Sequence, residues 1–185
     1  LMSKRAINMA RLRALKKAHR VTTVADLVNT MDHLLLANDG ENILVFGDMQ
    51  VVPYMSTIPL IHADGTFRCV LPGFSQLYIF HVVVANNVSV PAIYCLVNGK
   101  DKATYDKVLV LVEQVANMCG MHFLDREVTL MCDFEASFIG AVKMLYPSVT
   151  VKCCFFHFTK NVRTRAQPIV NDIGKNMGKT SEVYK

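Results

Sequence analysis

The sequence predicts an α/β fold built on a mixed five-stranded sheet flanked by helices. Three apolar, strand-like runs come first in the core, at residues 58–67, 77–85 and 88–97. Helical and strand-like patterns then alternate along the chain, which is typical of parallel crossover units. A right-handed crossover brings the fourth strand beside the first. The expected spatial order of the strands is therefore 3-2-1-4-5.

The later elements of the core follow from changes in apolar spacing and from turn residues. Strands two and three are expected to be joined by a hairpin turn at Asn86-Asn87, because Asn tolerates positive φ. The remaining predictions are a helix from about Ala103 to Met118, a strand at Val128–Cys132, a helix from Glu135 that ends before Pro147, a strand at Val149–Phe156 and a helix from about Thr159.

The part of the chain before the core is expected to be a basic helical extension with a short strand. Residues 3–20 and 24–36 have helical apolar spacing, and residues 43–46 form a short apolar run. The expected organisation is an N-terminal extension at 1–57, an incomplete α/β core at 58–167 and a polar tail at 168–185.

Composition indicates a globular chain. Apolar residues make up 52% and charged residues 19% of the 185 residues. No apolar run reaches the roughly 18 residues that a membrane span needs, so no membrane partner is expected. The six cysteines lie mostly in apolar runs, which is typical of free thiols in a reducing compartment. Because the chain begins with Leu and has no obvious end, we expect it to be a fragment.

Charge is distributed unevenly around a net value of +5. Residues 1–20 hold seven Lys/Arg and no acid, residues 21–149 hold six against thirteen, and residues 150–185 hold seven against two. Basic flanks around an acidic centre favour a protein that binds a polyanion and cuts it with metal ions. For the N-terminal run, an ordinary solvated helix face is an equal alternative.

Two acids stand out because each lies near the end of a predicted buried strand. Asp64 belongs to the first strand and Asp133 follows the fourth, so the predicted crossover makes them neighbours. Two carboxylates about 5 Å apart repel by about 3 kcal/mol at an effective dielectric constant of 20. Such a pair needs a proton or a divalent cation. Oxygen-only ligands favour Mg²⁺ or Mn²⁺ over zinc.

These acids also have plainer interpretations. Asp64 precedes Gly65 and could open a turn. Asp133 and Glu135 precede a helix, where an acid stabilises the dipole by about 0.3–1 kcal/mol. We favour the dipole role for Glu135 and metal binding for Asp133.

A Cys-x-x-His motif, Cys154 and His157, follows the fifth strand. It is either half of a zinc site or a buried cysteine beside a satisfied histidine. A second copy, Cys119 and His122, is expected at the opposite end of the sheet, about 15–20 Å away, as a helix terminus.

Four further polar residues are given structural interpretations. His62 shares a strand face with Asp64. For His62 and His81 the alternatives are a supporting role beside the site and core packing, and we favour core packing. Lys102 and Tyr105 are interpreted as a helix start and as core packing.

Five short motifs follow one another in the core. They are D-G-T-F at 64–67, Q-L-Y at 76–78, K-A-T-Y at 102–105, D-F-E at 133–135 and C-F-F-H-F at 154–158. In this order they resemble the Mutator-like element (MULE) transposase domain of the DDE superfamily, over roughly residues 58–167. The resemblance implies a ribonuclease H-like fold with an acidic, metal-dependent strand-transfer site.

The resemblance also implies roles for particular residues. Asp64 and Asp133 would be the first two catalytic, metal-binding acids of a DDE triad, with Mg²⁺ (or Mn²⁺) as cofactor. Cys154 and His157 match the family's Cys/His motif and would position the site or the DNA. The third acid, a Glu well beyond that motif, is not placed; Glu182 is the only Glu after Glu135 and lies in the polar tail.

The implied function is DNA transposition by a fragment of a transposase catalytic domain. Its partners would be transposon terminal inverted repeats and target DNA. It would act in the nucleus, as a homo-oligomer. Whether the fragment is itself an enzyme stays open because the third acid is missing. Two alternatives remain: a domesticated DNA-binding or regulatory module without catalysis, which the lack of the family's usual Trp favours, and a ribonuclease H-like nuclease acting on hybrids.

Overall fold

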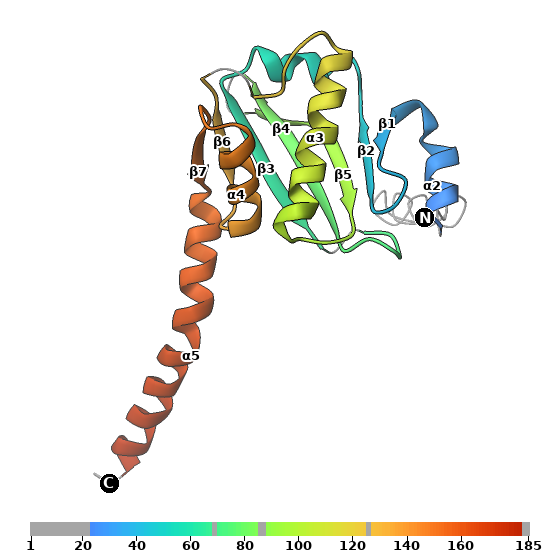
Figure 1. The fold of residues 1–185 in the computed structure, drawn as a ribbon. Coiled ribbons are helices and arrows are strands. Elements are labelled where there is room, and N and C mark those ends of the chain that lie inside the picture. Colours follow the sequence, from blue (N-terminus) through green and yellow to red (C-terminus); the bar gives the residue numbers. More distant parts are fainter. Residues whose placement is uncertain (1–22, 68–69, 85–87, 125–126, 183–185) are drawn as a thin grey trace, which may run out of the picture.

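One mixed sheet forms the centre of the body of the protein (Figure 1). The computed structural model describes residues 23–67, 70–84, 88–124 and 127–182. Strands are ordered β1-β2-β5-β4-β3-β6-β7. The core strands are β3 (Leu60–Thr66), β4 (Gln76–Val84), β5 (Val88–Val97), β6 (Thr129–Cys132) and β7 (Thr150–Cys153). Their order, β5-β4-β3-β6-β7, is the predicted 3-2-1-4-5.

The sheet has seven strands, so the predicted count of five is wrong. Strands β1 (Leu35–Asn38) and β2 (Ile43–Gly47) extend it beyond β5, and β2 runs antiparallel to β5. Every residue of β2 is buried, so this strand has apolar side chains to cover on both faces. The edge of β5 supplies the backbone partners that such a strand needs.

The helix predicted for residues 24–36 is shorter than expected. Helix α2 spans Val24–Thr30, followed by a 3₁₀ turn and then β1. A capping box starts it: the Asp26 N–H donates to Thr23 Oγ1 at 3.0 Å, and the Thr23 N–H donates to Asp26 Oδ2 at 3.0 Å. The helix predicted at 3–20 and the turn at Asn86-Asn87 lie outside the described residues.

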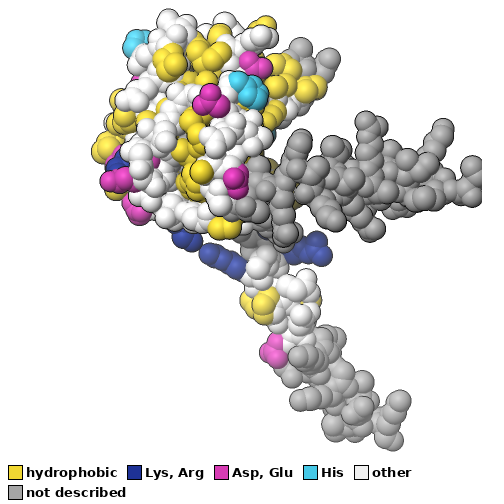
Figure 2. Space-filling model, turned by 90° about the vertical axis from the view of Figure 1, so that its right-hand side faces the viewer, with side chains coloured by type: hydrophobic (Ala, Val, Ile, Leu, Met, Phe, Trp, Pro, Cys, Tyr) yellow, Lys and Arg dark blue, Asp and Glu magenta, His cyan; other side chains and the backbone are white. Residues whose placement is uncertain are grey.

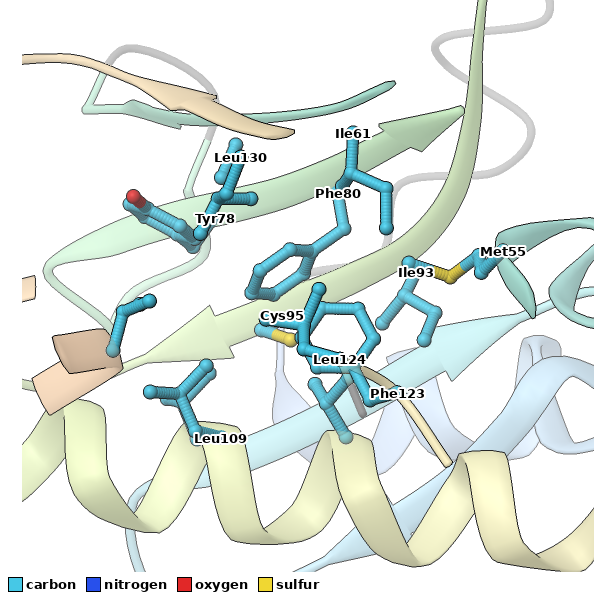
Figure 3. Packing of buried hydrophobic residues seen from close by; sticks show 14 of the residues in the cluster. Met55, Ile61, Tyr78, Phe80, Ile93, Cys95, Leu109, Phe123, Leu124 and Leu130 are labelled. Carbon is cyan, nitrogen blue, oxygen red and sulfur yellow. The ribbon is translucent and has the colours of Figure 1, made fainter. Parts of the chain in front are cut away.

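Helices α3 (Lys102–Met118) and α4 (Ala136–Leu145) cover one face of the sheet. Figure 3 shows the buried side chains of this core meeting between α3 and the strands. Aromatic rings form its centre: the Tyr78 ring centroid lies 5.4 Å from that of Tyr105 and 4.7 Å from that of Phe138. This packing gives the central strands a rigid base.

On the opposite face, helix α2 packs over the β1–β2 side of the sheet. Leu44 and Phe46 of β2 and Leu96 of β5 form a second buried cluster with apolar residues of α2 and of the segment 70–74. Because β2 alternates between the two clusters, it links both layers of the molecule.

Helix α5 (Phe155–Glu182) leaves the sheet after β7 and projects away from the body (Figure 1). The predicted strand to Phe156 and helix start near Thr159 are wrong by a few residues. The Cys154 N–H still donates to the Cys132 carbonyl at 2.7 Å, and the Phe158 N–H already donates to the Cys154 carbonyl at 3.0 Å. The aromatic run after Cys154 therefore starts the helix, which also continues through the predicted polar tail.

The helices of the described residues include no candidate for a membrane span. Within the described ranges, no helix combines the length and apolar character needed to cross a bilayer. The 28-residue α5 carries charged and amide side chains along its length.

Candidate functional site

Two parallel central strands bring the predicted acids to the same end of the sheet. Strand β3 pairs with β6, with His62 opposite Met131. This is the last pair between the two strands; continued by two residues, the same offset would bring Asp64, on β3, level with Asp133, the residue that follows β6. The predicted adjacency of the first and fourth strands is therefore confirmed. Asp64 has 52% of its side chain exposed, and Asp133 is half-buried.

The Asp64-Gly65 pair lies inside β3, so the interpretation of Asp64 as a turn residue is wrong. The two residues pair with Ile79 and Tyr78 of β4. A Cβ atom on Gly65 would lie 3.1 Å from Gln76 Oε1 and 3.1 Å from Tyr78 Cδ2. Glycine is needed here because the buried side chains of β4 fill the space beneath it.

Glu135 lies at the N-terminus of α4, as predicted, but its side chain makes no capping hydrogen bond. Its backbone N–H donates to Asp133 Oδ1 at 3.1 Å, which limits where that carboxylate points. Burial raises the pKa of the Glu135 carboxyl, and the charge of Asp133 adds to this rise. Hydrogen bonding to the Tyr105 hydroxyl and the charge of Lys100 lower the same pKa.

A buried hydrogen-bond chain lies beneath this carboxyl. The Gln76 side chain is fully buried, and its Nε2 donates to the Tyr105 hydroxyl oxygen at 2.8 Å and to the Gly99 carbonyl at 2.9 Å. Tyr105 is buried as predicted, and burial followed by the neighbouring Glu135 raises its pKa. Residues from three of the recognised motifs thus meet at the start of α4. Sequence reasoning missed this link because Gln76 and Tyr105 are 29 positions apart.

His157 lines both of the cavities in which the two acids lie. Its Nε2 is 3.8 Å from Asp64 Oδ1. It lines both a cavity of about 510 Å³ that contains Asp133 and Glu135 and a cavity of about 180 Å³ that contains Asp64. The histidine of the Cys-x-x-His motif therefore contacts the side of the sheet where the acids lie.

The smaller cavity is rich in imidazole. His62 and His81 are direct cross-strand neighbours beside Asp64, and Cys154 lines the same cavity. Burial lowers the pKa of both histidines, and the charge of His62 lowers that of His81 further while Asp64 opposes it. Both are half-buried at a cavity wall, so their interpretation as packed core residues is wrong.

The larger cavity combines acids, cations and aromatic rings. Its lining comprises Gly65, Thr66, Phe67, Lys100, Asp133, Phe134, Glu135, His157, Lys160 and Asn161. Of these, only Asp133 and His157 were selected from the sequence as site residues. The two phenylalanines belong to the D-G-T-F and D-F-E motifs, whereas Lys100 and Lys160 lie outside every recognised motif. These residues become a group only because the ends of β3 and β6 and the start of α5 lie at one place.

The donors beside the two acids differ between the cavities. Asp133 shares the larger cavity with Glu135 and His157, whereas Asp64 shares the smaller one with three histidines and Cys154. No three described His, Cys, Asp or Glu residues are arranged to hold a metal ion together. Burial raises the pKa of the Cys132 thiol to about 12, so this neighbour of Asp133 stays protonated and neutral. Asp64 and Asp133 therefore offer two carboxylates, the donor type that hard divalent cations prefer, with imidazole nitrogens beside Asp64.

The second Cys-x-x-His is a helix terminus, as predicted. Cys119 is the C-terminal cap of α3, and Gly120 follows with φ of 70°. His122 Nδ1 lies 2.8 Å from Glu113 Oε1, and Tyr146 donates to Glu113 Oε2 at 3.0 Å. Glu113 therefore ties this loop to the end of α4.

Glu182 is remote from the acids. It ends α5, whose 28 residues extend about 40 Å at 1.5 Å per residue. Figure 1 shows that this helix carries its far end away from the sheet.

Comparison with known proteins identifies the same segment. A family model described as the MULE transposase domain matches residues 60–161, which is more than half of the chain. The match begins with β3, ends in the first turns of α5 and includes Asp64, Asp133, Cys154 and His157. No curated protein matches the chain.

Proposed function

Because this chain belongs to the MULE transposase domain family, we propose that it carries part of the catalytic site of a DDE-type DNA transposase. Asp64 and Asp133 hold Mg²⁺ or Mn²⁺ for phosphodiester hydrolysis and strand transfer in a ribonuclease H-like fold. The observation that carries this proposal is the parallel pairing of β3 with β6, whose register, continued beyond His62 and Met131, supports neighbouring positions for the two acids. A transposase domain implies an interaction with DNA, whose phosphates these ions would contact.

The donor chemistry supports a hard divalent cation. Two adjacent carboxylates repel by about 3 kcal/mol at 5 Å and an effective dielectric constant of 20. A bound cation would remove this repulsion, and the Cys132 thiol does not compete as a ligand because it is buried in the core. When bound, such ions activate a water or a 3′-hydroxyl and stabilise the leaving oxygen of an in-line displacement.

The residues around the acids orient them. The Glu135 N–H fixes one oxygen of Asp133, and the buried Gln76–Tyr105 pair supports the start of α4 from below. His157, 3.8 Å from Asp64, adds an imidazole to the other side of the site. These contacts reduce the reorganisation that metal binding requires.

The same proposal covers location and assembly. The DNA partners are terminal inverted repeats and a target site, the compartment is the nucleus, and the working form is a homo-oligomer. The third acid comes from outside the described cluster.

Calorimetric titration with Mn²⁺ tests the metal site directly. The parent chain is expected to bind, whereas Asp64→Asn and Asp133→Asn each weaken binding by at least about tenfold, which corresponds to about 1.4 kcal/mol. Asp106→Asn is the matched control, because Asp106 pairs with Lys102 on α3. Unchanged Mn²⁺ affinity in both site variants would refute the proposed metal role.

A plasmid-nicking assay separates the enzyme from its alternative. In a protein that also supplies the third acid, the enzyme predicts Mg²⁺-dependent nicking that Asp64→Asn abolishes. A domesticated DNA-binding module predicts DNA affinity that is independent of both aspartates, with no heat of Mn²⁺ binding.

A further inference from the structure

Exposed phenylalanine rings gather around the larger cavity. Phe67, Phe134 and Phe158 are 57%, 46% and 49% exposed, and the first two line the cavity itself. The Phe134 ring centroid lies 6.3 Å from that of Phe158, which in turn stacks on Phe155 at 6.2 Å. We call these four residues the aromatic patch. Large apolar side chains exposed together mark an interaction site.

Cations and amides are interleaved with these rings. Lys100, Lys160 and Asn161 line the same cavity as Phe67 and Phe134. Figure 2 shows Lys and Arg side chains at the lower edge of the body and around the start of the projecting helix.

The polar face continues along α5. Arg163 lies three residues after Lys160, so the two side chains are neighbours on one helix face. Arg163, Gln167 and Asn171 line the next hollow along that face. This row leads away from the aromatic patch and offers donors to a chain of phosphates.

The chemistry of the patch decides between possible occupants. The core of a protein–protein interface is depleted in charged residues, whereas here Lys100, Lys160 and the carboxylate of Asp133 lie among the rings. Aromatic rings combined with cations are the pattern that binds unpaired nucleic acid, through base stacking and phosphate contacts. A paired duplex buries the faces of its bases and offers the rings nothing to stack on.

We propose that the aromatic patch binds unpaired bases of a DNA strand beside Asp133, and that Lys160 and Arg163 contact the phosphates of the same strand. The substrate form recognised at this site is thus a frayed or single-stranded end, not a closed duplex. This inference relies on the proposed function for DNA as the polymer and goes beyond it in naming the strand form.

Fluorescence anisotropy with the full chain tests the strand form without metal. Two duplexes that share the same labelled strand are compared in EDTA. In the blunt DNA, the second strand pairs along its whole length, and in the forked DNA it is mismatched over several nucleotides at one end. We expect the forked DNA to bind about tenfold more tightly than the blunt DNA. Equal affinity for the two DNAs overturns the inference.

Single substitutions test whether the aromatic patch is the source of the preference for forked DNA. Phe134→Leu keeps apolar volume but loses the ring, and is expected to reduce affinity for forked DNA about tenfold. Phe134→Trp keeps an aromatic ring and is expected to keep the affinity of the parent. Tyr54→Leu is the matched control, because Tyr54 is 58% exposed and lies in the 3₁₀ helix η2 (Val52–Ser56), before the start of β3. Thermal unfolding verifies that each variant is folded.

Other outcomes are decisive in the same experiments. If Phe134→Leu binds forked DNA like the parent, or if it instead dissociates a dimer seen by light scattering, the patch is not a nucleotide site. If the chain prefers forked DNA but does not bind Mn²⁺, only the metal proposal is refuted. If it binds Mn²⁺ but does not prefer forked DNA, only the proposed binding of unpaired bases is refuted.

Discussion

The face of the sheet that lies opposite α3 has two halves, and these differ in the side chains that they expose. On the β1–β2 side, Leu44, Phe46 and Leu96 are buried under α2. On the β3–β6 side, the side chains of His62 and Asp64 line a cavity or face solvent. Both halves belong to one continuous sheet. Covered apolar residues stabilise the fold, whereas the uncovered half keeps polar groups accessible for chemistry.

The difference shows how a rigid site is obtained without burying its charges. Beneath the acids, the other face of the same strands packs into the aromatic core (Figure 3). Carboxylates at the strand ends are held by their backbone and stay hydrated. Substitutions should therefore separate into those that unfold the protein and those that change only the site.

The largest effect is expected in the core beneath the site. Phe138→Ala removes a fully buried ring that packs against Tyr78 and Tyr105, and should lower the free energy of unfolding by about 3–5 kcal/mol. Phe155→Ala, at a ring 75% exposed, should change it by less than about 0.5 kcal/mol. Urea unfolding followed by circular dichroism measures both. Similar losses would contradict the division between core and site.

Mn²⁺ should stabilise the parent protein and not the site variant. At a hundredfold excess over the dissociation constant, a bound ion adds about 2.7 kcal/mol to the free energy of unfolding. Asp133→Asn should lose this increment, and without metal it should be no less stable than the parent because a repulsion is removed. Thermal denaturation with and without Mn²⁺ provides the measurement. An increment that persists in Asp133→Asn would place the ion elsewhere.

Gly65→Ala should disturb the contact between β3 and β4. The new methyl group would lie 3.1 Å from Gln76 Oε1 and from the Tyr78 ring, and we expect a loss of about 1–3 kcal/mol in the free energy of unfolding. Gly140→Ala is the control, because no atom lies within 4 Å of its added methyl and alanine favours the helix by about 0.5–1 kcal/mol. Denaturant melts of both variants should therefore shift in opposite directions.

Glu135→Gln should produce the smallest effect, and one that depends on pH. The folded-state pKa of this carboxyl is raised, so its contribution to stability is complete below the unfolded value of 4.5 and is lost as pH rises through the folded pKa. The glutamine variant does not titrate. Its stability relative to the parent should thus be higher at pH 7 than at pH 4, by a fraction of a kcal/mol. Urea unfolding at both pH values detects the difference, and an unchanged gap would contradict the raised pKa.

Local pattern predicted most of the core elements. β5 and the C-terminus of α3 lie where their spacing indicated, and the crossover rule correctly made β3 and β6 neighbours. The edge strand β1 was missed because residues 35–36 continue a helical apolar pattern and become a strand only by pairing with β2. The start of α5 was misplaced because Phe155 and Phe156 suit a strand as well as a helix.

The candidate site was only partly predictable for the same reason. Asp64 and Asp133 carry signals in their own segments, since each is an acid beside a buried apolar run. Lys100 and Lys160 lie outside the recognised motifs and acquire meaning only from neighbours that are distant along the chain. The hydrogen bond from Gln76 to Tyr105 depends on how α3 lies on β4.

Spacing of apolar residues, turn residues and motif letters is a local property, so the chain alone specified an α/β fold, its family and two acids on adjoining strands. Folding in three dimensions created β1 and joined it and the predicted short strand β2 to the core sheet. It also brought His157 to both cavities that hold the acids and gathered phenylalanines and lysines around one of them. These arise from contacts between segments far apart in sequence, and such contacts depend on the packing of the whole core rather than on any one stretch.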